Sequence, residues 1–88
     1  MATIYGTEWN DFKAGGWGND TIYGYGGDDL LNGGGGDDTI YGGSGVDIIT
    51  GYWGNDTLYG GADNDFVYGG NGNDILYGDD GLDTEAGG

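Results

Sequence analysis

The feature that most constrains this chain is a nine-residue repeat that runs from residue 15 to residue 86 without an insertion. The first three copies read GGWGNDTIY, GYGGDDLLN and GGGGDDTIY, and five more follow in the same register. Position one is glycine and position six is aspartate in all eight copies, and position eight is aliphatic in all but the last. A period of this length indicates a stack of equivalent units that bury a shared core.

The repeat also has a longer period of two copies, because the odd copies share a last residue that most even copies lack. Tyrosine recurs at the end of every odd copy, at Tyr5, Tyr23, Tyr41, Tyr59 and Tyr77. Most even copies carry other residues there, such as Asn32 and Thr50, although the sixth copy ends in Tyr68. We therefore predict an all-β coil with eighteen-residue turns, in which each turn adds one short strand to each of two parallel sheets. Residues one turn apart then stack about 4.8 Å from each other.

The last three residues of each copy are predicted to form the strands, whose side chains alternate between faces. Position eight then points inward. The predicted core is Ile4, Ile22, Leu31, Ile40, Ile49, Leu58, Val67 and Leu76. Lys13 and Glu85 occupy this inward position at the two ends of the even sheet. Inward charges on terminal strands discourage pairing with another chain, so we interpret both residues as caps.

The repeat covers the whole sequence, so we predict one array over residues 1–88 with no second domain. Residues 1–14 form a degenerate N-terminal capping turn that keeps Gly6 and Asp11, residues 15–86 hold the eight repeats, and residues 87–88 start a truncated one. The first ten residues lack the basic start and apolar stretch of a secretory signal peptide. No apolar run approaches the ~20 residues of a membrane span, so no membrane insertion is expected.

The composition excludes several functions. The net charge is −15 and Lys13 is the single basic residue, so nucleic acid is not an expected partner. The absence of cysteine and histidine removes disulfides, thiolate or imidazole metal sites, and Ser-His or Cys-His catalysis. Paired carboxylates can hydrolyse glycosides only beside a substrate cleft, which a narrow roll does not offer. We therefore expect no enzyme activity.

The stacked aspartates repel one another, which indicates that a cation binds between them. Carboxylates ~4.8 Å apart repel by about 1 kcal/mol per pair in water and by about 3.5 kcal/mol at an effective dielectric constant of 20. A divalent cation between the loops reverses this term, and loop glycines allow backbone carbonyls to face one point. Oxygen ligands suit a hard cation. Calcium accepts 6–8 oxygens in flexible geometry, whereas magnesium needs a tight octahedron, so we predict calcium.

The repeats closely resemble the RTX, or haemolysin-type, calcium-binding nonapeptide repeat, whose pattern is G-G-x-G-x-D-x-U-x. The resemblance implies a right-handed parallel β-roll in a secreted, extracellular bacterial protein. It also implies that the metal ligands are the position-six aspartates and the loop carbonyls at positions two and four. The implied carboxylate ligands are Asp20, Asp29, Asp38, Asp47, Asp56, Asp65, Asp74 and Asp83. The implied carbonyl ligands are Gly16, Gly18, Gly27, Gly34, Gly36, Gly43, Gly45, Gly54, Gly61, Asp63, Gly70 and Gly72.

The number of sites follows from how these loops stack. Loops 15–20, 33–38, 51–56 and 69–74 stack along one edge, and loops 24–29, 42–47, 60–65 and 78–83 along the other. Four loops enclose three gaps, so about six full calcium sites are predicted. The eroded loop 6–11 carries Thr7 and Trp9 at positions two and four, which puts a site there in doubt.

The leading functional hypothesis is a calcium-triggered folding module that condenses outside the cell. The alternative is a recognition module for polysaccharide, ice or a protein partner on the calcium-loaded scaffold. Irregular outer loop residues argue against ice, and the single lysine argues against anionic polysaccharide. Weak end-to-end self-association and polysaccharide contact stay open as further interactions. We expect the tyrosine column to stabilise its sheet, with a docking face as the alternative.

Overall fold

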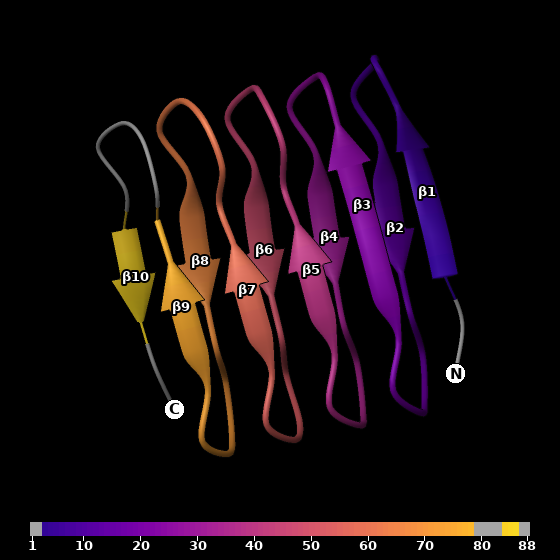
Figure 1. Ribbon diagram of the computed structural model, residues 1–88, viewed down its shortest axis with the longest axis vertical. Helices are drawn as coiled ribbons and strands as arrows, with labels where there is room; N and C mark the ends of the chain where they lie inside the picture. The colour runs from indigo at the N-terminus through magenta and orange to yellow at the C-terminus, as the bar shows by residue number, and fades with distance from the viewer. Residues whose placement is uncertain (1–2, 79–83, 87–88) are drawn as a thin grey trace.

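The computed structural model describes residues 3–78 and 84–86, which form ten strands and no helix (Figure 1). No helix that could cross a membrane is therefore present in this part of the chain. The strands are β1 (Thr3–Thr7), β2 (Phe12–Ala14), β3 (Thr21–Tyr25), β4 (Leu30–Asn32), β5 (Thr39–Tyr41), β6 (Ile48–Thr50), β7 (Thr57–Tyr59), β8 (Phe66–Tyr68), β9 (Ile75–Tyr77) and β10 (Thr84–Ala86).

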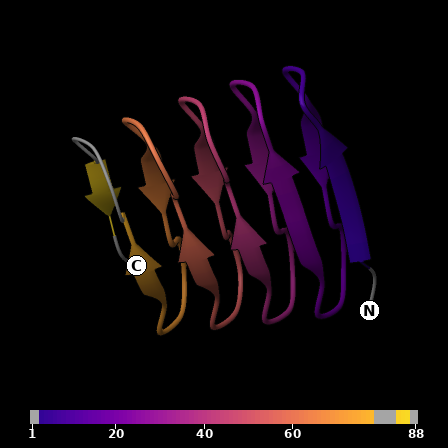
Figure 2. The ribbon, with the colours of Figure 1, turned by 45° about the horizontal axis from the view of Figure 1, so that its top comes forward.

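The strands form two five-stranded parallel sheets that face each other, as the predicted coil requires. One sheet has the order β1-β3-β5-β7-β9 and the other the order β10-β8-β6-β4-β2. Figures 1 and 2 show successive turns of the chain advancing from the N-terminal end to the C-terminal end of both layers. Each strand pairs with the strand two repeats away in the sequence, for example Ile22 with Ile40 and Leu31 with Ile49. The eighteen-residue turn is confirmed.

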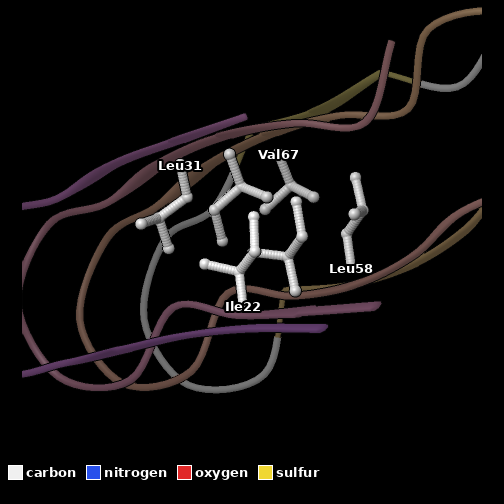
Figure 3. Close-up of a cluster of buried hydrophobic side chains, with 6 residues drawn as sticks. Ile22, Leu31, Leu58 and Val67 are labelled. Carbon is white, nitrogen blue, oxygen red and sulfur yellow. The ribbon is translucent and has the colours of Figure 1, made fainter. Parts of the chain in front are cut away.

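The core lies between the sheets and consists of the predicted position-eight residues. Six of them are completely buried, namely Ile22, Leu31, Ile40, Ile49, Leu58 and Val67. Figure 3 shows Ile22 from one sheet and Leu31 and Val67 from the other pointing into the same layer. Ile4 and Leu76 pack against this cluster and are only partly buried. They lie on the edge strands β1 and β9, where one side of the layer is open.

The two residues interpreted as caps lie at opposite ends of the even sheet. Lys13 pairs in register with Leu31 and is half-buried. Glu85 pairs in register with Val67, but its side chain lies outside the described residues. Their positions in the register agree with the prediction, and the capping role itself stays a prediction.

The tyrosine column forms a continuous stack on the outer face of the odd sheet. Successive ring centroids from Tyr5 to Tyr77 are 5.4, 5.0, 4.8 and 4.8 Å apart, with interplanar angles of 5–8°. Each inner ring therefore has its faces covered by its neighbours, which stabilises the pairing of the strands beneath.

Two strands are longer than the three residues predicted. β1 continues to Thr7 and β3 continues to Tyr25, because these two residues also pair with each other. This extension changes the first loop of the roll.

Candidate metal centre

The position-six aspartates form one buried row along each edge of the roll. The exposed fraction of the residue is 3% or less at Asp20, Asp29, Asp38, Asp47, Asp56 and Asp65. Asp74 is half-buried, and the predicted ligand Asp83 lies outside the described residues. Burying carboxylates side by side is costly unless the charges are compensated.

One oxygen of each carboxylate ties neighbouring turns together. Oδ1 of Asp38 accepts the backbone N–H of Asp20 at 2.8 Å, and Oδ1 of Asp56 accepts that of Asp38 at 2.7 Å. The opposite edge repeats the pattern, since Oδ1 of Asp47 accepts the N–H of Asp29 at 2.9 Å. Each donor lies one eighteen-residue turn before its acceptor in the sequence. The rows are therefore fixed to the backbone of the preceding turn.

The second carboxylate oxygen, Oδ2, makes no such bond in several of these aspartates. Oδ2 is buried and has no hydrogen-bond partner at Asp29, Asp38, Asp47, Asp56 and Asp74. Buried carboxylate oxygens are normally paired with a donor or a cation, so these atoms are candidate ligands for a cation. The position-one glycine of the same repeat makes room for this oxygen. A Cβ on Gly42, for example, would lie 2.8 Å from Oδ2 of Asp47.

The electrostatics of the rows point the same way. Burial raises the pKa of Asp38 to about 7, of Asp47 to about 8 and of Asp56 to about 6, and it also raises the pKa of Asp29. The backbone N–H from the preceding turn lowers each value in part, and neighbouring carboxylates raise it further. Without a cation, the Asp38 and Asp47 carboxylates therefore resist ionisation at neutral pH.

The loop backbone is left-handed at positions two and four of every described loop from 15–20 to 69–74, with φ between 66° and 103°. Glycine occupies most of these positions, because left-handed backbone is costly for other residues. Asp63 adopts φ 72° at position four, a conformation that aspartate tolerates better than most residues. Tyr25 and Tyr52 adopt φ 66° and 71° at position two, a conformation that their side chains disfavour.

The two sets of predicted carbonyl ligands differ in their hydrogen bonds. Position-two carbonyls accept a backbone N–H from the next turn, as in Gly35 N–H to Gly16 O at 2.9 Å and Trp53 N–H to Gly34 O at 3.1 Å. No loop N–H among the described residues donates to a position-four carbonyl oxygen. Position-four carbonyls therefore keep more of their acceptor capacity for a cation.

Position five carries a second ladder that our sequence analysis missed. Oδ1 of Asn19 accepts the N–H of Asp37 at 2.8 Å, and Oδ1 of Asp37 accepts the N–H of Asn55 at 2.8 Å. Asp28 likewise accepts the N–H of Val46 at 2.9 Å. These exposed side chains link successive loops on the solvent side of the buried rows. The recurrence of Asn or Asp at position five of most copies was the available signal.

The donor set fits a hard cation. No three acidic side chains of the described residues converge on one point, so a cation at the rows must take most of its ligands from backbone carbonyls. Carboxylate and carbonyl oxygens, with no nitrogen or sulfur donor, are the set that calcium prefers. The described surface has no pocket for an organic substrate.

Comparison with protein families agrees with this chemistry. The model of the RTX calcium-binding nonapeptide repeat, which spans four copies, matches the chain twice, over residues 14–49 and 50–85. Comparisons with curated proteins and with solved structures found no match. The two family matches are adjacent and cover most of the sequence. The chain therefore belongs to the RTX calcium-binding nonapeptide repeat family, as a calcium-binding β-roll.

Proposed function

We propose that this β-roll is a calcium-triggered folding module that holds about six ions between its stacked loops and works outside the cell. The observation that carries the proposal is the pair of rows of buried Oδ2 atoms, which lack a hydrogen-bond partner at five of the aspartates on the two edges. An atom of this kind destabilises the fold until a cation reaches it.

The ligands that we propose are the position-six carboxylates together with the loop carbonyls of the same edge. Position-four carbonyls such as Gly36 and Gly45 come first, because no loop N–H of the described residues donates to them. Position-two carbonyls such as Gly16 already accept one N–H and contribute through their second lone pair. Calcium supplies positive charge to these oxygens when it is bound.

Folding and binding are coupled in this arrangement because each carboxylate row spans successive turns. An unfolded chain separates Asp38 from Asp56 and cannot present both to one ion, so only the folded roll offers complete sites. Ligands that bind the folded state alone stabilise it, and several weak sites together produce a steep response. Extracellular calcium-binding modules typically have dissociation constants of ~10⁻⁴–10⁻³ M, which keeps such a chain unfolded in a calcium-poor cytoplasm.

Circular dichroism during a calcium titration, with magnesium as the control, tests this function. At neutral to mildly alkaline pH we expect a coil spectrum in EDTA, a cooperative rise of β signal with calcium, and little response to magnesium. Isothermal titration calorimetry on the same sample should give about six ions per chain. A β spectrum that EDTA leaves unchanged would contradict the proposal. A glycan-binding assay on the calcium-loaded chain tests the alternative role as a recognition module.

A further inference from the structure

The first loop of the roll, residues 6–11, is built differently from all later described loops. Thr7 stands at position two, where it ends β1 and pairs with Tyr25. Neither Thr7 nor Trp9 has a positive φ, although positions two and four are left-handed in the later described loops. The first loop therefore lacks the backbone curl that turns carbonyl oxygens toward one point.

The carboxylate of this loop also has a different partner. Asp11 lies over Gly6 as the later aspartates lie over their own position-one glycines. Its Oδ2, however, accepts the backbone N–H of Thr7 at 2.6 Å and the Thr7 hydroxyl at 3.0 Å. The equivalent Oδ2 of Asp38 or Asp47 is buried without a hydrogen-bond partner. Thr7 thus supplies to Oδ2 of Asp11 the donors that Oδ2 of Asp38 and of Asp47 lack.

The remaining bonds of the loop are satisfied within the chain as well. The Thr7 hydroxyl oxygen accepts the N–H of Trp9 at 3.1 Å, and the Asp11 N–H donates to Oδ1 of Asp29 at 2.8 Å. The carbonyl oxygens of Thr7 and Asp11 accept N–H groups from the second turn, those of Gly26 at 3.1 Å and Leu30 at 2.8 Å. These bonds between the first and second turns are of the same kind as those that join later turns, so the first loop is set apart by the bonds from Thr7 to Asp11.

A second feature stabilises the same end without metal. The ring of Tyr25 stacks on Tyr5 and Tyr23, with centroids 6.3 and 6.0 Å away, while Tyr5 and Tyr23 stack on each other at 5.4 Å. Tyr52 also has a positive φ at position two of its loop. Among the described residues its ring takes part in no stack. The aromatic cluster therefore belongs to the N-terminal turn alone and offsets the strain at Tyr25.

We propose that Thr7 closes the first loop in place of calcium, so that the N-terminal turn is a metal-independent cap on which calcium-dependent folding builds toward the C-terminus. This inference rests on the proposed function, because it assigns the order in which the loops of the same module form. Loop 6–11 takes no ion of its own, and the second turn docks onto a surface that needs none.

Two variants test the role of Thr7, with Thr57→Val as the matched control because Thr57 lies on strand β7 outside the loops. Thr7→Val removes the hydroxyl and keeps the shape. Loss of a hydrogen bond to a carboxylate lowers the equilibrium constant for folding by about 10- to 100-fold. Spread over about six ions, this raises the calcium midpoint by about 1.5- to 2-fold. T57V should leave the midpoint unchanged.

The double variant Thr7→Gly, Trp9→Gly restores the repeat pattern, since residues 6–11 then read GGEGND. We expect it to bind one more calcium ion per chain than the wild type in isothermal titration calorimetry. Hydrogen exchange on the wild type at sub-saturating calcium reports the direction of folding. The amides of Gly26 and Leu30, which donate to the first turn, should become protected at a lower calcium concentration than that of Ile75.

The outcomes separate this inference from the proposed function. If the wild type does not respond to calcium at all, the proposed function itself fails. If the wild type folds with calcium but T7V and T57V have the same midpoint, the cap fails and the function stands. An unchanged ion count in the double variant, or protection of Ile75 before Gly26, would likewise overturn the cap.

Discussion

Replacing Asp38 with asparagine should act in opposite directions on the metal-free and the calcium-loaded chain. Asparagine keeps an Oδ1 that can accept the N–H of Asp20, a bond of 2.8 Å. It replaces the buried, unpartnered Oδ2 with an amide group that cannot ionise. The metal-free roll should therefore become more stable, while the calcium-loaded roll loses a charged ligand.

The magnitude follows from the pKa of Asp38, which burial raises from 3.8 to about 7. Below pH 3.8 the carboxyl is neutral in the folded and unfolded chains, so it has no ionisation cost. Between pH 3.8 and about 7 the unfolded chain loses the proton first, so the folded state loses stability as the pH rises, and above pH 7 the loss is constant. A rise of about three pKa units corresponds to about 4 kcal/mol. We expect D38N to gain at most about this much at pH 8, because its buried amide NH2 group also has a desolvation cost, and almost nothing at pH 4.

Folding in EDTA, driven by an excluded osmolyte such as trimethylamine N-oxide and followed by circular dichroism, measures the gain. The control is Asp37→Asn, which removes the same charge from an exposed neighbour whose Oδ1 accepts the N–H of Asn55 at 2.8 Å. D38N should fold at a lower osmolyte concentration than the wild type at pH 8, and D37N should show a much smaller decrease, because the Asp37 charge is only a minor cause of the raised pKa of Asp38. In calcium titrations D38N should need more calcium and bind fewer ions. If the two variants behave alike, burial of the Asp38 charge is not what destabilises the metal-free roll.

Three further predictions follow from the same geometry. In EDTA the wild type should be compact near pH 4 and lose β signal as the pH rises to about 8, because burial raises the pKa of aspartates such as Asp47, and a flat profile by circular dichroism would contradict this. Gly16 and Gly34 have φ of 85° and 84°, but an added Cβ meets open space at Gly16 and collides with the Gly16 carbonyl at Gly34. Thermal melts in saturating calcium should therefore show a loss of about 1–2 kcal/mol for G16A and a much larger loss for G34A, whereas equal losses would refute the close approach. Tyr52→Gly should raise the free energy of unfolding in urea by up to about 1 kcal/mol, because it relieves a φ of 71°. Tyr25→Gly should gain less, because the ring that it removes stacks on two others. A larger gain for Tyr25→Gly than for Tyr52→Gly would be inconsistent with the aromatic cluster.

The period predicted the fold because residues at the same position of the repeat stack on one another along the roll. Ile22, Leu31 and Ile40 share one position of the nonapeptide, and each is completely buried in register with its counterpart one turn away. A one-residue slip would place these side chains outside, so the pattern admits a single register.

The candidate site was less predictable, because periodicity indicates which residues stack but not which atoms meet. The repeat placed Asp38 above Asp20, but it could not tell that Oδ1 binds the Asp20 backbone and leaves Oδ2 alone. The left-handed backbone of Tyr25 could not be predicted either, because tyrosine disfavours this conformation and only the geometry of the loop imposes it. Thr7 was recognised as a departure from the repeat, but its bonds to Asp11 depend on the extension of β1, which no local pattern predicts.

The most direct test of the account is a crystal structure of the chain grown with excess calcium, with anomalous scattering to identify the ions. We expect about six calcium ions per chain, each about 2.3–2.6 Å from an Oδ2 of a position-six aspartate and from loop carbonyl oxygens. Calcium found elsewhere, or well-ordered carboxylate rows with no ion beside them, would contradict it.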